Sequence, residues 1–286
     1  MDGLPSSYVP ARIVRRQDHT ESLATFWLRP ERRIGFRPGQ YVTLALPGED
    51  GRWIKRPYSV LSTPHEDVLE LFVECVDGGA LTPCLFEQHE GDDVGVRGRA
   101  AGAFARDDER THHVMACTVT GIAPFLSMLR DARQRGETGH RYLVLYGASH
   151  PDDLGPYASE LAALAREADV TGVATVSRPW EAEGWTGETG RVEDVLRKHL
   201  DARGWDPREA AGYGCGNPAM LQNVLGVLRR AGFDADHLHE EAYFPDAGET
   251  APAEAPPAAP PARRQGVPMT PPGGVVLKTA PRPPGA

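Results

Sequence analysis

Residues 113–135 read HVMACTVTGIAPFLSMLRDARQR, and this segment is the most informative about the fold. Its first six residues form a short apolar run that predicts a buried strand, and residues 123–135 have the apolar period of a helix. Only the turn at 119–122 separates the two. A strand that runs directly into a helix is the repeating unit of a sheet with parallel strands.

The same alternation continues downstream of this stretch. We expect strands at 142–146, 170–176 and 211–213, and helices at 157–167, 192–199 and 218–230. This order predicts a parallel sheet with helices on both faces. Ligands bind such sheets at the carboxyl ends of the strands, where the motifs 118–125 and 213–220 fall.

Upstream, the pattern is one of short apolar runs separated by turn residues. We expect strands at 9–16, 24–28, 40–46, 56–61, 68–75 and 92–96, with one short helix at 81–88. Short strands at this spacing predict an antiparallel barrel. The expected domains are therefore a barrel at 1–107 and an α/β domain at 108–246.

The last part of the chain has a different composition. Twelve of the 26 prolines lie at or after residue 245, and no aromatic residue does. Such a segment cannot bury enough apolar surface to offset the entropy of ordering the chain. We expect residues 247–286 to be a disordered tail rich in proline and alanine.

Composition and charge narrow the classes of function. The start of the chain lacks a secretory signal and no apolar run approaches a membrane span, so we expect a cytoplasmic protein without a membrane partner. The net charge of −9 argues against nucleic acid. Residues 1–60 are locally basic, with ten Lys or Arg against six Asp or Glu. This bias indicates either ordinary surface or a docking face for an acidic partner.

The cysteines argue against a metal centre. Cys75, Cys84, Cys117 and Cys215 form no C-x-x-C pair, so we expect free thiols, no zinc and no iron–sulfur cluster. If the chain handles electrons, an organic cofactor must carry them.

Four motifs occur in a fixed order along the chain. Gly39-Gln40-Tyr41 is followed by Arg56-Pro57-Tyr58-Ser59, then by Gly79-Ala80-Leu81-Thr82, and Cys215-Gly216-Asn217-Pro218 comes after the central turn. Together with residues 118–125, they resemble the ferredoxin–NADP reductase family over roughly residues 8–244. The resemblance implies a Greek-key barrel that binds FAD, an α/β domain that binds NAD(P), and hydride transfer between the two cofactors.

The barrel motifs have side chains suited to a flavin. Arg56 offers a planar fork to phosphate oxygens, Tyr58 an aromatic face and Ser59 a hydrogen bond. On a strand, Arg56 and Tyr58 point one way and Ser59 the other, so a bend or bulge is needed to bring all three to one ligand. Alone, the motif is more typical of a plain strand with an exposed Arg and a packed Tyr. The resemblance implies FAD contacts from Arg56, Pro57, Tyr58, Ser59, Gly79, Leu81 and Thr82.

The central turn presents backbone amides and a helix N-terminus to a pyrophosphate. The resemblance implies nucleotide contacts from Thr120, Gly121, Ile122, Ala123 and Pro124. The family usually has glycine where this chain has Val119, and a β-branched residue does not readily adopt a positive φ. Either the loop does not need that geometry at Val119, which we favour, or nucleotide binding is impaired.

The choice between nicotinamide nucleotides depends on charge near the 2′-phosphate. Ser177, Arg178 and Arg191 match positions where the family binds that phosphate, whereas Ser149 stands where many bacterial relatives have arginine. We expect NADP, with NAD as the alternative.

The remaining site residues follow from the resemblance. Cys215, Gly216, Asn217 and Met220 are expected to contact the nicotinamide nucleotide, and Tyr243 or Phe244 to stack on the flavin. The expected catalytic side chains are those of Ser59, Cys215, Glu241 and Tyr243.

The leading interpretation is a monomeric FAD-dependent NAD(P)H reductase that serves ferredoxin or flavodoxin. Two alternatives remain open. The electron acceptor could be an oxygenase component, a cytochrome or free flavin, or the chain could be a regulatory module that binds flavin or nucleotide without turnover.

Overall fold

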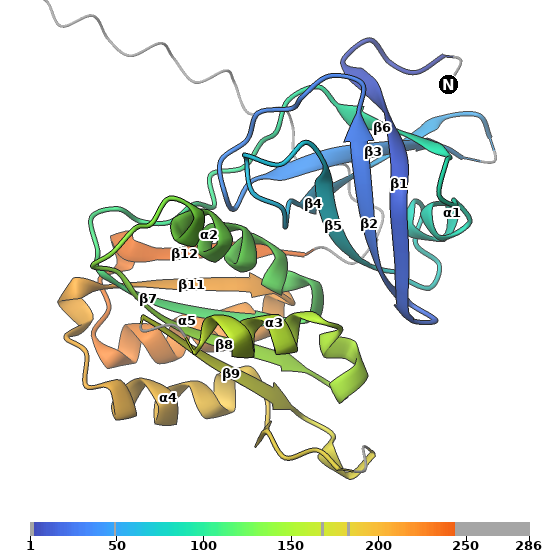
Figure 1. Ribbon diagram of the computed structural model, residues 1–286. Helices are drawn as coiled ribbons and strands as arrows, with labels where there is room; N and C mark the ends of the chain where they lie inside the picture. Colours follow the sequence, from blue (N-terminus) through green and yellow to red (C-terminus); the bar gives the residue numbers. More distant parts are fainter. Residues whose placement is uncertain (1–2, 49, 167–168, 182–183, 244–286) are drawn as a thin grey trace, which may run out of the picture. The chain divides into compact units, whose positions relative to one another are not determined.

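The computed structural model describes residues 3–48, 50–166, 169–181 and 184–243 (Figure 1). They form two six-stranded sheets, one antiparallel and one parallel. The expected tail at 247–286 and the expected stacking residue Phe244 lie outside the described residues. The domain limits at 107 and 246 stay predictions.

The antiparallel sheet has the order β4-β3-β6-β1-β2-β5, so neighbouring strands are mostly distant in sequence, as in a Greek key. Its edge strands approach each other where Leu61 N–H donates to Glu70 O at 2.8 Å, which makes the sheet a barrel. The strands are β1 (Tyr8–Thr20), β2 (Leu23–Pro30), β3 (Tyr41–Pro47), β4 (Trp53–Ser59), β5 (Leu69–Glu74) and β6 (Asp93–Arg97), and helix α1 (Thr82–Phe86) precedes β6.

The barrel core comes from the inward residues of these strands. Ile13, Phe26, Leu44 and Leu71 are fully buried together. In β1 the exposed Arg12 lies between the buried residues Ala11 and Ile13, the alternation expected of a sheet with one wet face. The expected barrel is confirmed.

The parallel sheet has the order β10-β9-β8-β7-β11-β12. Its strands are β7 (His112–Thr118), β8 (Arg141–Ala148), β9 (Val170–Val176), β10 (Glu188–Thr189), β11 (Ala210–Gly216) and β12 (Leu238–Ala242). The helices are α2 (Ala123–Gln134), α3 (Tyr157–Leu164), α4 (Val192–Arg203) and α5 (Pro218–Ala231). Short 3-10 helices are η1 (Val119–Ile122), η2 (Pro151–Leu154), η3 (Pro179–Glu181), η4 (Pro207–Glu209) and η5 (Ala235–His237).

Alternate residues of the central strands pack into two separate hydrophobic cores. Met115 and Cys117 on β7 pack with α2 and α3, whereas Val114 and Ala116 pack with α4 and α5. Because strand side chains alternate between faces, each face of the sheet is buried under its own pair of helices. The expected α/β architecture is confirmed.

Several expected elements have other limits in the structure. The strand expected at 56–61 runs from Trp53 to Ser59, and the strand expected at 211–213 extends from Ala210 to Gly216. Strands β10 and β12 were not expected, because two residues are too few for a pattern and 238–242 are largely polar. Among the described helices, none has both the length and the apolar character needed to cross a membrane.

Candidate functional site

The turn after β7 has an unusual backbone. Strand β7 ends at Thr118, the 3-10 helix η1 spans Val119–Ile122, and α2 begins at Ala123. Val119 has φ +45°, and it is the only described residue other than glycine with a positive φ. Our expectation that the loop does not need this geometry at residue 119 was wrong. The loop keeps the conformation in which glycine is usual, with valine in it.

Close packing explains why the turn holds this shape. A side chain on Gly121 would overlap the carbonyl oxygen of Cys215 at the end of β11. Gly216 has φ +137°, and a Cβ there would lie 2.5 Å from Thr118 Oγ1. The ends of β7 and β11 therefore touch through glycine backbone, and the expected nucleotide residues of both motifs lie side by side.

Asn217 has a structural partner. Its side-chain oxygen accepts a hydrogen bond from Ala219 N–H at 2.9 Å, which caps the N-terminus of α5. The cap leaves the side-chain amide and the neighbouring backbone of Asn217 to meet a ligand. Met220, in the first turn of α5, is buried with its methyl group near Gly216.

Tyr243 joins the two glycine motifs. Its hydroxyl donates to Thr120 O at 3.1 Å, and Cys215 Sγ lies 3.5 Å from the same hydroxyl. Its backbone N–H donates to Gly216 O at 2.9 Å. Burial raises the pKa of both the Tyr243 phenol and the Cys215 thiol well above their usual values, so both groups are neutral.

Glu241 reaches the barrel from the edge of the parallel sheet. Ser59 Oγ donates to Glu241 Oε1 at 2.6 Å, across 182 residues of sequence. Burial raises the pKa of Glu241, and the Ser59 hydrogen bond opposes this in part. The four expected catalytic side chains are thus brought to one place, as two hydrogen-bonded pairs from β4, β11 and the end of β12.

The linker between the two sheets anchors β12. His237 Nδ1 and His239 Nε2 lie 2.6 and 3.3 Å from the same carboxylate oxygen of Asp107. Burial raises the pKa of that carboxyl, but its hydrogen bonds, first that with His237, outweigh the effect and lower it. This anchor, which sequence analysis missed, fixes the start of the strand whose other end carries Glu241.

The three expected flavin residues on β4 do not converge. Strands β3 and β4 pair in unbroken register from Tyr41 with Ser59 to Pro47 with Trp53, so the bulge that would turn them together is absent from this pair of described strands. Arg56 and Tyr58 are half-buried on one face, and Ser59 is buried on the other. Pro57 is exposed. Arg56 and Tyr58 can therefore face one ligand group while Ser59 faces the parallel sheet.

The turn before α1 is held by Thr82. The Thr82 hydroxyl accepts from Val76 N–H at 3.0 Å and so closes the loop that contains Gly79. Leu81 is fully buried in the barrel core, which leaves only its backbone to meet a ligand. The side chains of Thr82 and Leu81, both expected to contact FAD, thus contact the protein itself, Thr82 through Val76 and Leu81 through the barrel core.

Acidic and basic side chains meet at the carboxyl ends of β8 and β9. The backbone N–H groups of Ser177 and Arg178 donate to Ala148 and Ser149 O, both at 3.0 Å. Arg178 is exposed, with its guanidinium 4.0 Å from Glu181. Arg191 is exposed at the N-cap of α4.

His150 shares the Glu181 carboxylate at 2.7 Å, and this hydrogen bond raises the pKa of His150 and lowers that of Glu181. Sequence analysis missed both residues of this pair, although His150 directly follows Ser149.

Comparisons with known proteins match both halves of the chain. Residues 11–105 match the family model of the oxidoreductase FAD-binding domain, and residues 115–225 match that of the oxidoreductase NAD-binding domain. Ferredoxin–NADP reductase B of Sorangium cellulosum is 33% identical over 215 residues, which cover 73% of this chain and 85% of that protein. The chain belongs to the ferredoxin–NADP reductase family.

Two further relatives extend the comparison. The ferredoxin–NAD(P)(+) reductase component of the naphthalene 1,2-dioxygenase system of Pseudomonas putida is 29% identical, over 84% of this chain and 70% of that protein. In structure, the chain resembles a ferredoxin NADP+ reductase from Neisseria gonorrhoeae with bound FAD and NADP. The TM-score is 0.74, at 25% identity, over 84% of this chain and all of that one.

The family assignment makes the chain a flavoprotein oxidoreductase with FAD and a nicotinamide nucleotide as cofactors. The geometry fits both. The half-buried residues 118–120 lie at the carboxyl end of β7, beside the close contacts of Gly121 and Gly216, and β4 offers Arg56 and Tyr58 on one face. All four cysteines are free. Within the described part of the chain, no cluster of three or more His, Cys, Asp or Glu could hold a metal ion.

Proposed function

We propose that this chain transfers hydride between NADPH and FAD and exchanges electrons, one at a time, with a separate electron carrier. The contact between Ser59 and Glu241 carries the proposal. It joins the barrel strand that holds the expected flavin residues to the strand end that bears Glu241 and Tyr243. A reductase needs this meeting, because its two cofactors are bound by different sheets and must react in contact.

Bound FAD supplies the capacity to accept hydride and to release single electrons. The side chains of this protein bind and orient. Arg56 offers its guanidinium to phosphate oxygens, and the amides of 120–123 with the positive end of α2 attract the nucleotide pyrophosphate. Ser59 holds Glu241 where the barrel meets the parallel sheet. Cys215 and Tyr243 pack against each other beside the turn at 119–122.

We assign NADPH as the preferred nucleotide, with NADH as the alternative. Arg178 and Arg191 are exposed at the ends of β9 and before α4, where a 2′-phosphate would approach the sheet edge. Glu181 opposes this preference, because its carboxylate lies beside Arg178 and would repel a phosphate.

We further propose that the carrier is an acidic ferredoxin or flavodoxin, that it docks on the barrel, and that the reductase acts as a monomer. Arg29, Arg32, Arg33 and Arg37 are exposed within nine residues that contain one glutamate. This segment leads into Gln40, whose carbonyl accepts from Val60 N–H directly after Ser59. Basic charge near the proposed flavin strand would steer an acidic partner.

A second candidate is the reductase component of an oxygenase system. The similarity to the Pseudomonas putida protein, which has that role by name, favours it. The two candidates share the cofactor chemistry and differ only in the acceptor.

The test is the visible spectrum of the purified protein under anaerobic conditions, with NADPH in one cuvette and NADH in another. We expect a flavin band that bleaches quickly, and faster with NADPH. A flavin band that neither nucleotide bleaches would refute the reductase and leave a binding module. Once the flavin is reduced, transfer to ferredoxin, flavodoxin or an oxygenase component separates the two candidates.

A further inference from the structure

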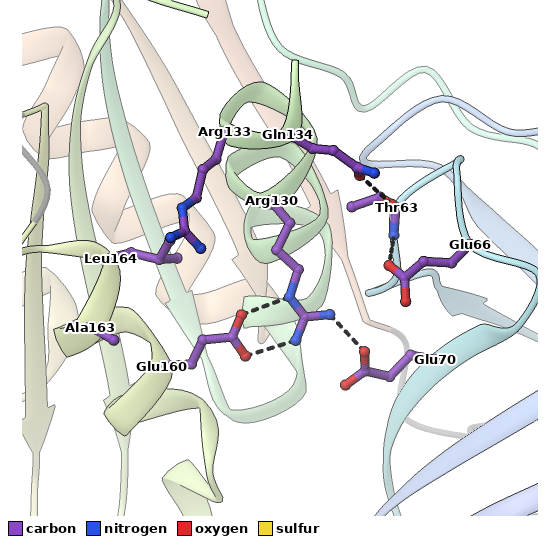
Figure 2. A pocket seen from close by; sticks show the side chains of 9 residues that line it. All are labelled: Thr63, Glu66, Glu70, Arg130, Arg133, Gln134, Glu160, Ala163 and Leu164. Atoms are coloured by element: carbon purple, nitrogen blue, oxygen red, sulfur yellow. Dashed lines mark hydrogen bonds and ion pairs between the residues drawn. The ribbon is translucent and has the colours of Figure 1, made fainter. Parts of the chain in front are cut away.

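A half-buried arginine connects the barrel with two helices of the parallel sheet. Arg130 on α2 donates from Nη1 to Glu70 Oε2 on β5 at 2.6 Å and to Leu61 O at 3.2 Å. Its Nε and Nη2 donate to the two carboxylate oxygens of Glu160 on α3, at 2.6 and 2.7 Å. Glu70, Arg130 and Glu160 line a cavity of about 690 Å³ (Figure 2).

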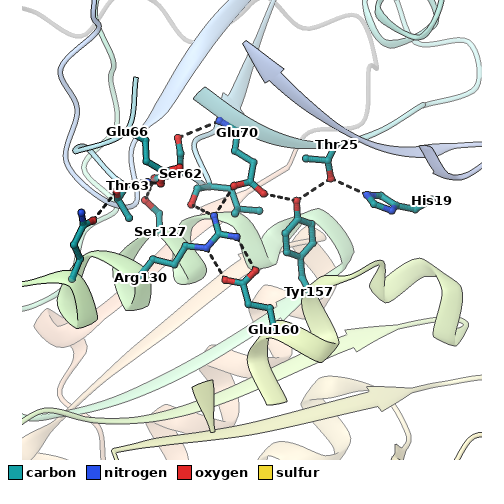
Figure 3. A network of polar contacts seen from close by, with 12 residues as sticks. His19, Thr25, Ser62, Thr63, Glu66, Glu70, Ser127, Arg130, Tyr157 and Glu160 are labelled. Carbon is teal, nitrogen blue, oxygen red and sulfur yellow. Dashed lines mark hydrogen bonds and ion pairs between the residues drawn. The ribbon is translucent and has the colours of Figure 1, made fainter. Parts of the chain in front are cut away.

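The network extends further into the barrel (Figure 3). Tyr157 on α3 donates to Glu70 Oε1 at 2.9 Å, and its hydroxyl also lies 2.9 Å from Thr25 Oγ1 on β2. Thr25 in turn contacts His19 Nε2 at 2.8 Å. Glu70 therefore accepts hydrogen bonds from two different helices. Each of its two carboxylate oxygens binds a donor across the contact between the barrel and the helices.

One face of α2 lies along the barrel segment that joins β4 to β5. Ser127 Oγ donates to Ser62 O at 2.8 Å, Arg130 reaches Leu61 and Glu70, and Gln134 Oε1 accepts from Thr63 Oγ1 at 3.1 Å. The positions 127, 130 and 134 repeat at three and four residues, which places them on one side of the helix. The helix is thus tied to the barrel along its length.

Both ends of this contact lead directly to the proposed site. Helix α2 begins at Ala123, at the end of the nucleotide turn 119–122. On the barrel side, Leu61 and Ser62 follow Ser59 by two and three residues. A shift of α2 against residues 61–70 would therefore move the nucleotide turn relative to the flavin strand.

We propose that Glu70 and Arg130 are positioning residues for hydride transfer, and that their ion pair sets the distance between the nucleotide turn and the flavin strand. The inference rests on the proposed reductase function. Arg130 keeps its charge throughout, because the hydrogen bonds that it donates to its two carboxylate partners raise its pKa against the effect of burial. Misplacement of reacting groups by about 1 Å can slow a reaction about a hundredfold, so this contact has a kinetic consequence beyond stability.

Glu70→Gln and Glu160→Gln form a matched pair of variants. Each carboxylate accepts two hydrogen bonds, and each variant removes one negative charge beside Arg130. In Glu160→Gln the NH₂ group faces an N–H donor of Arg130, whereas in Glu70→Gln it can face the Tyr157 hydroxyl, which can accept and donate to Thr25 instead. Each also leaves Arg130 one carboxylate. They differ in that Glu70 links α2 to the barrel, whereas Glu160 links α2 to α3 within the parallel-sheet half.

The kinetic assay is anaerobic single-turnover reduction of the bound FAD by saturating NADPH. We expect Glu70→Gln to slow it by roughly ten- to a hundredfold, with FAD content and the Kd for NADP+ little changed. Glu160→Gln should retain the rate within about threefold. Ser127→Ala, which removes a smaller contact with the barrel, should slow reduction in the same direction and serves if Glu70→Gln does not fold.

Calorimetry gives a readout that does not depend on turnover. The unaltered protein and Glu160→Gln should unfold in one cooperative transition, and Glu70→Gln should show two, because the barrel and the parallel-sheet half lose their coupling. Equal slowing by both glutamine variants, or one transition and an unchanged rate in Glu70→Gln, would overturn the proposal. If NADPH does not reduce the unaltered protein, the proposed function fails, while the calorimetric comparison still decides the coupling.

Discussion

Replacement of Val119 by glycine and by alanine tests the positive φ in the nucleotide turn. At φ +45° a residue with a Cβ is strained by about 1–2 kcal/mol, and glycine is not. Both replacements lose the contacts of the half-buried valine with the core, so these cancel between them. Glycine also gives the unfolded chain more entropy, which costs about 0.4–1 kcal/mol. We expect Val119→Gly to be more stable than Val119→Ala by about 0.5–1 kcal/mol.

The sign of this difference is the decisive quantity. At an ordinary backbone position alanine is more stable than glycine by about 0.5–1 kcal/mol. Thr120 is the matched control, since it follows Val119 in the same 3-10 helix and does not have a positive φ. Urea unfolding of the four variants measures the free energies. If alanine is the more stable replacement at both positions, the backbone at Val119 is not left-handed and our account of the turn is wrong.

The same variants bear on nucleotide binding. Because the turn already has its glycine-like shape with valine in place, Val119→Gly should change the Kd for NADP+ by less than about threefold. A large gain in NADPH-dependent flavin reduction would mean that the valine side chain itself limits turnover.

Three further predictions concern charge. Burial raises the pKa of Glu241 above its ordinary 4.5, so the folded protein favours the protonated carboxyl. This contribution to the free energy of unfolding is fully present below about pH 4.5 and is lost as the pH rises through the raised pKa. In Glu241→Gln the unfolding free energy from urea titration should therefore fall less between about pH 4 and pH 7, and an equal fall in both proteins would contradict this. Reversal of exposed charges in Arg32→Glu with Arg33→Glu should raise the KM for ferredoxin several-fold at low ionic strength and little at high, whereas a difference independent of salt would refute electrostatic docking. Glu181→Gln removes the carboxylate that His150 and the neighbouring arginine share, so the ratio of kcat/KM for NADPH to that for NADH should rise, and a fall would reverse our account of this corner.

Local patterns in the sequence were enough to predict the two sheets. The apolar run at 113–118 and the helical period at 123–135 appear as β7 and α2, because both segments bury what their patterns mark as apolar. Strand β12 could not be predicted in this way. Residues 238–242 include His239, Glu240 and Glu241, and they form a strand only because β11 offers its edge and Asp107 holds the preceding histidine.

The site was predicted as a set of residues, and its geometry was not. Resemblance named Ser59 and Glu241, but nothing local to either indicates a hydrogen bond across 182 residues. The positive φ of Val119 contradicts local preference, since close packing at Gly121 and Gly216 dictates the turn instead. Glu70 and Arg130 belong to no motif, so the contact between the barrel and α2 could be found only in three dimensions.

Burial affects the protonation of three of the four proposed catalytic side chains in different ways. It raises the pKa of the Cys215 thiol and of the Tyr243 phenol, groups that are already neutral at pH 7, and so moves both further from ionisation. A thiolate nucleophile at Cys215 is therefore disfavoured, in keeping with a role in orienting a ring. For Glu241 the same burial moves the pKa toward neutrality, with Ser59 opposing it. Among the four, only Glu241 has its pKa shifted upward from an acidic value, so it is our candidate for proton exchange, and the hydrogen bond with Ser59 limits that shift.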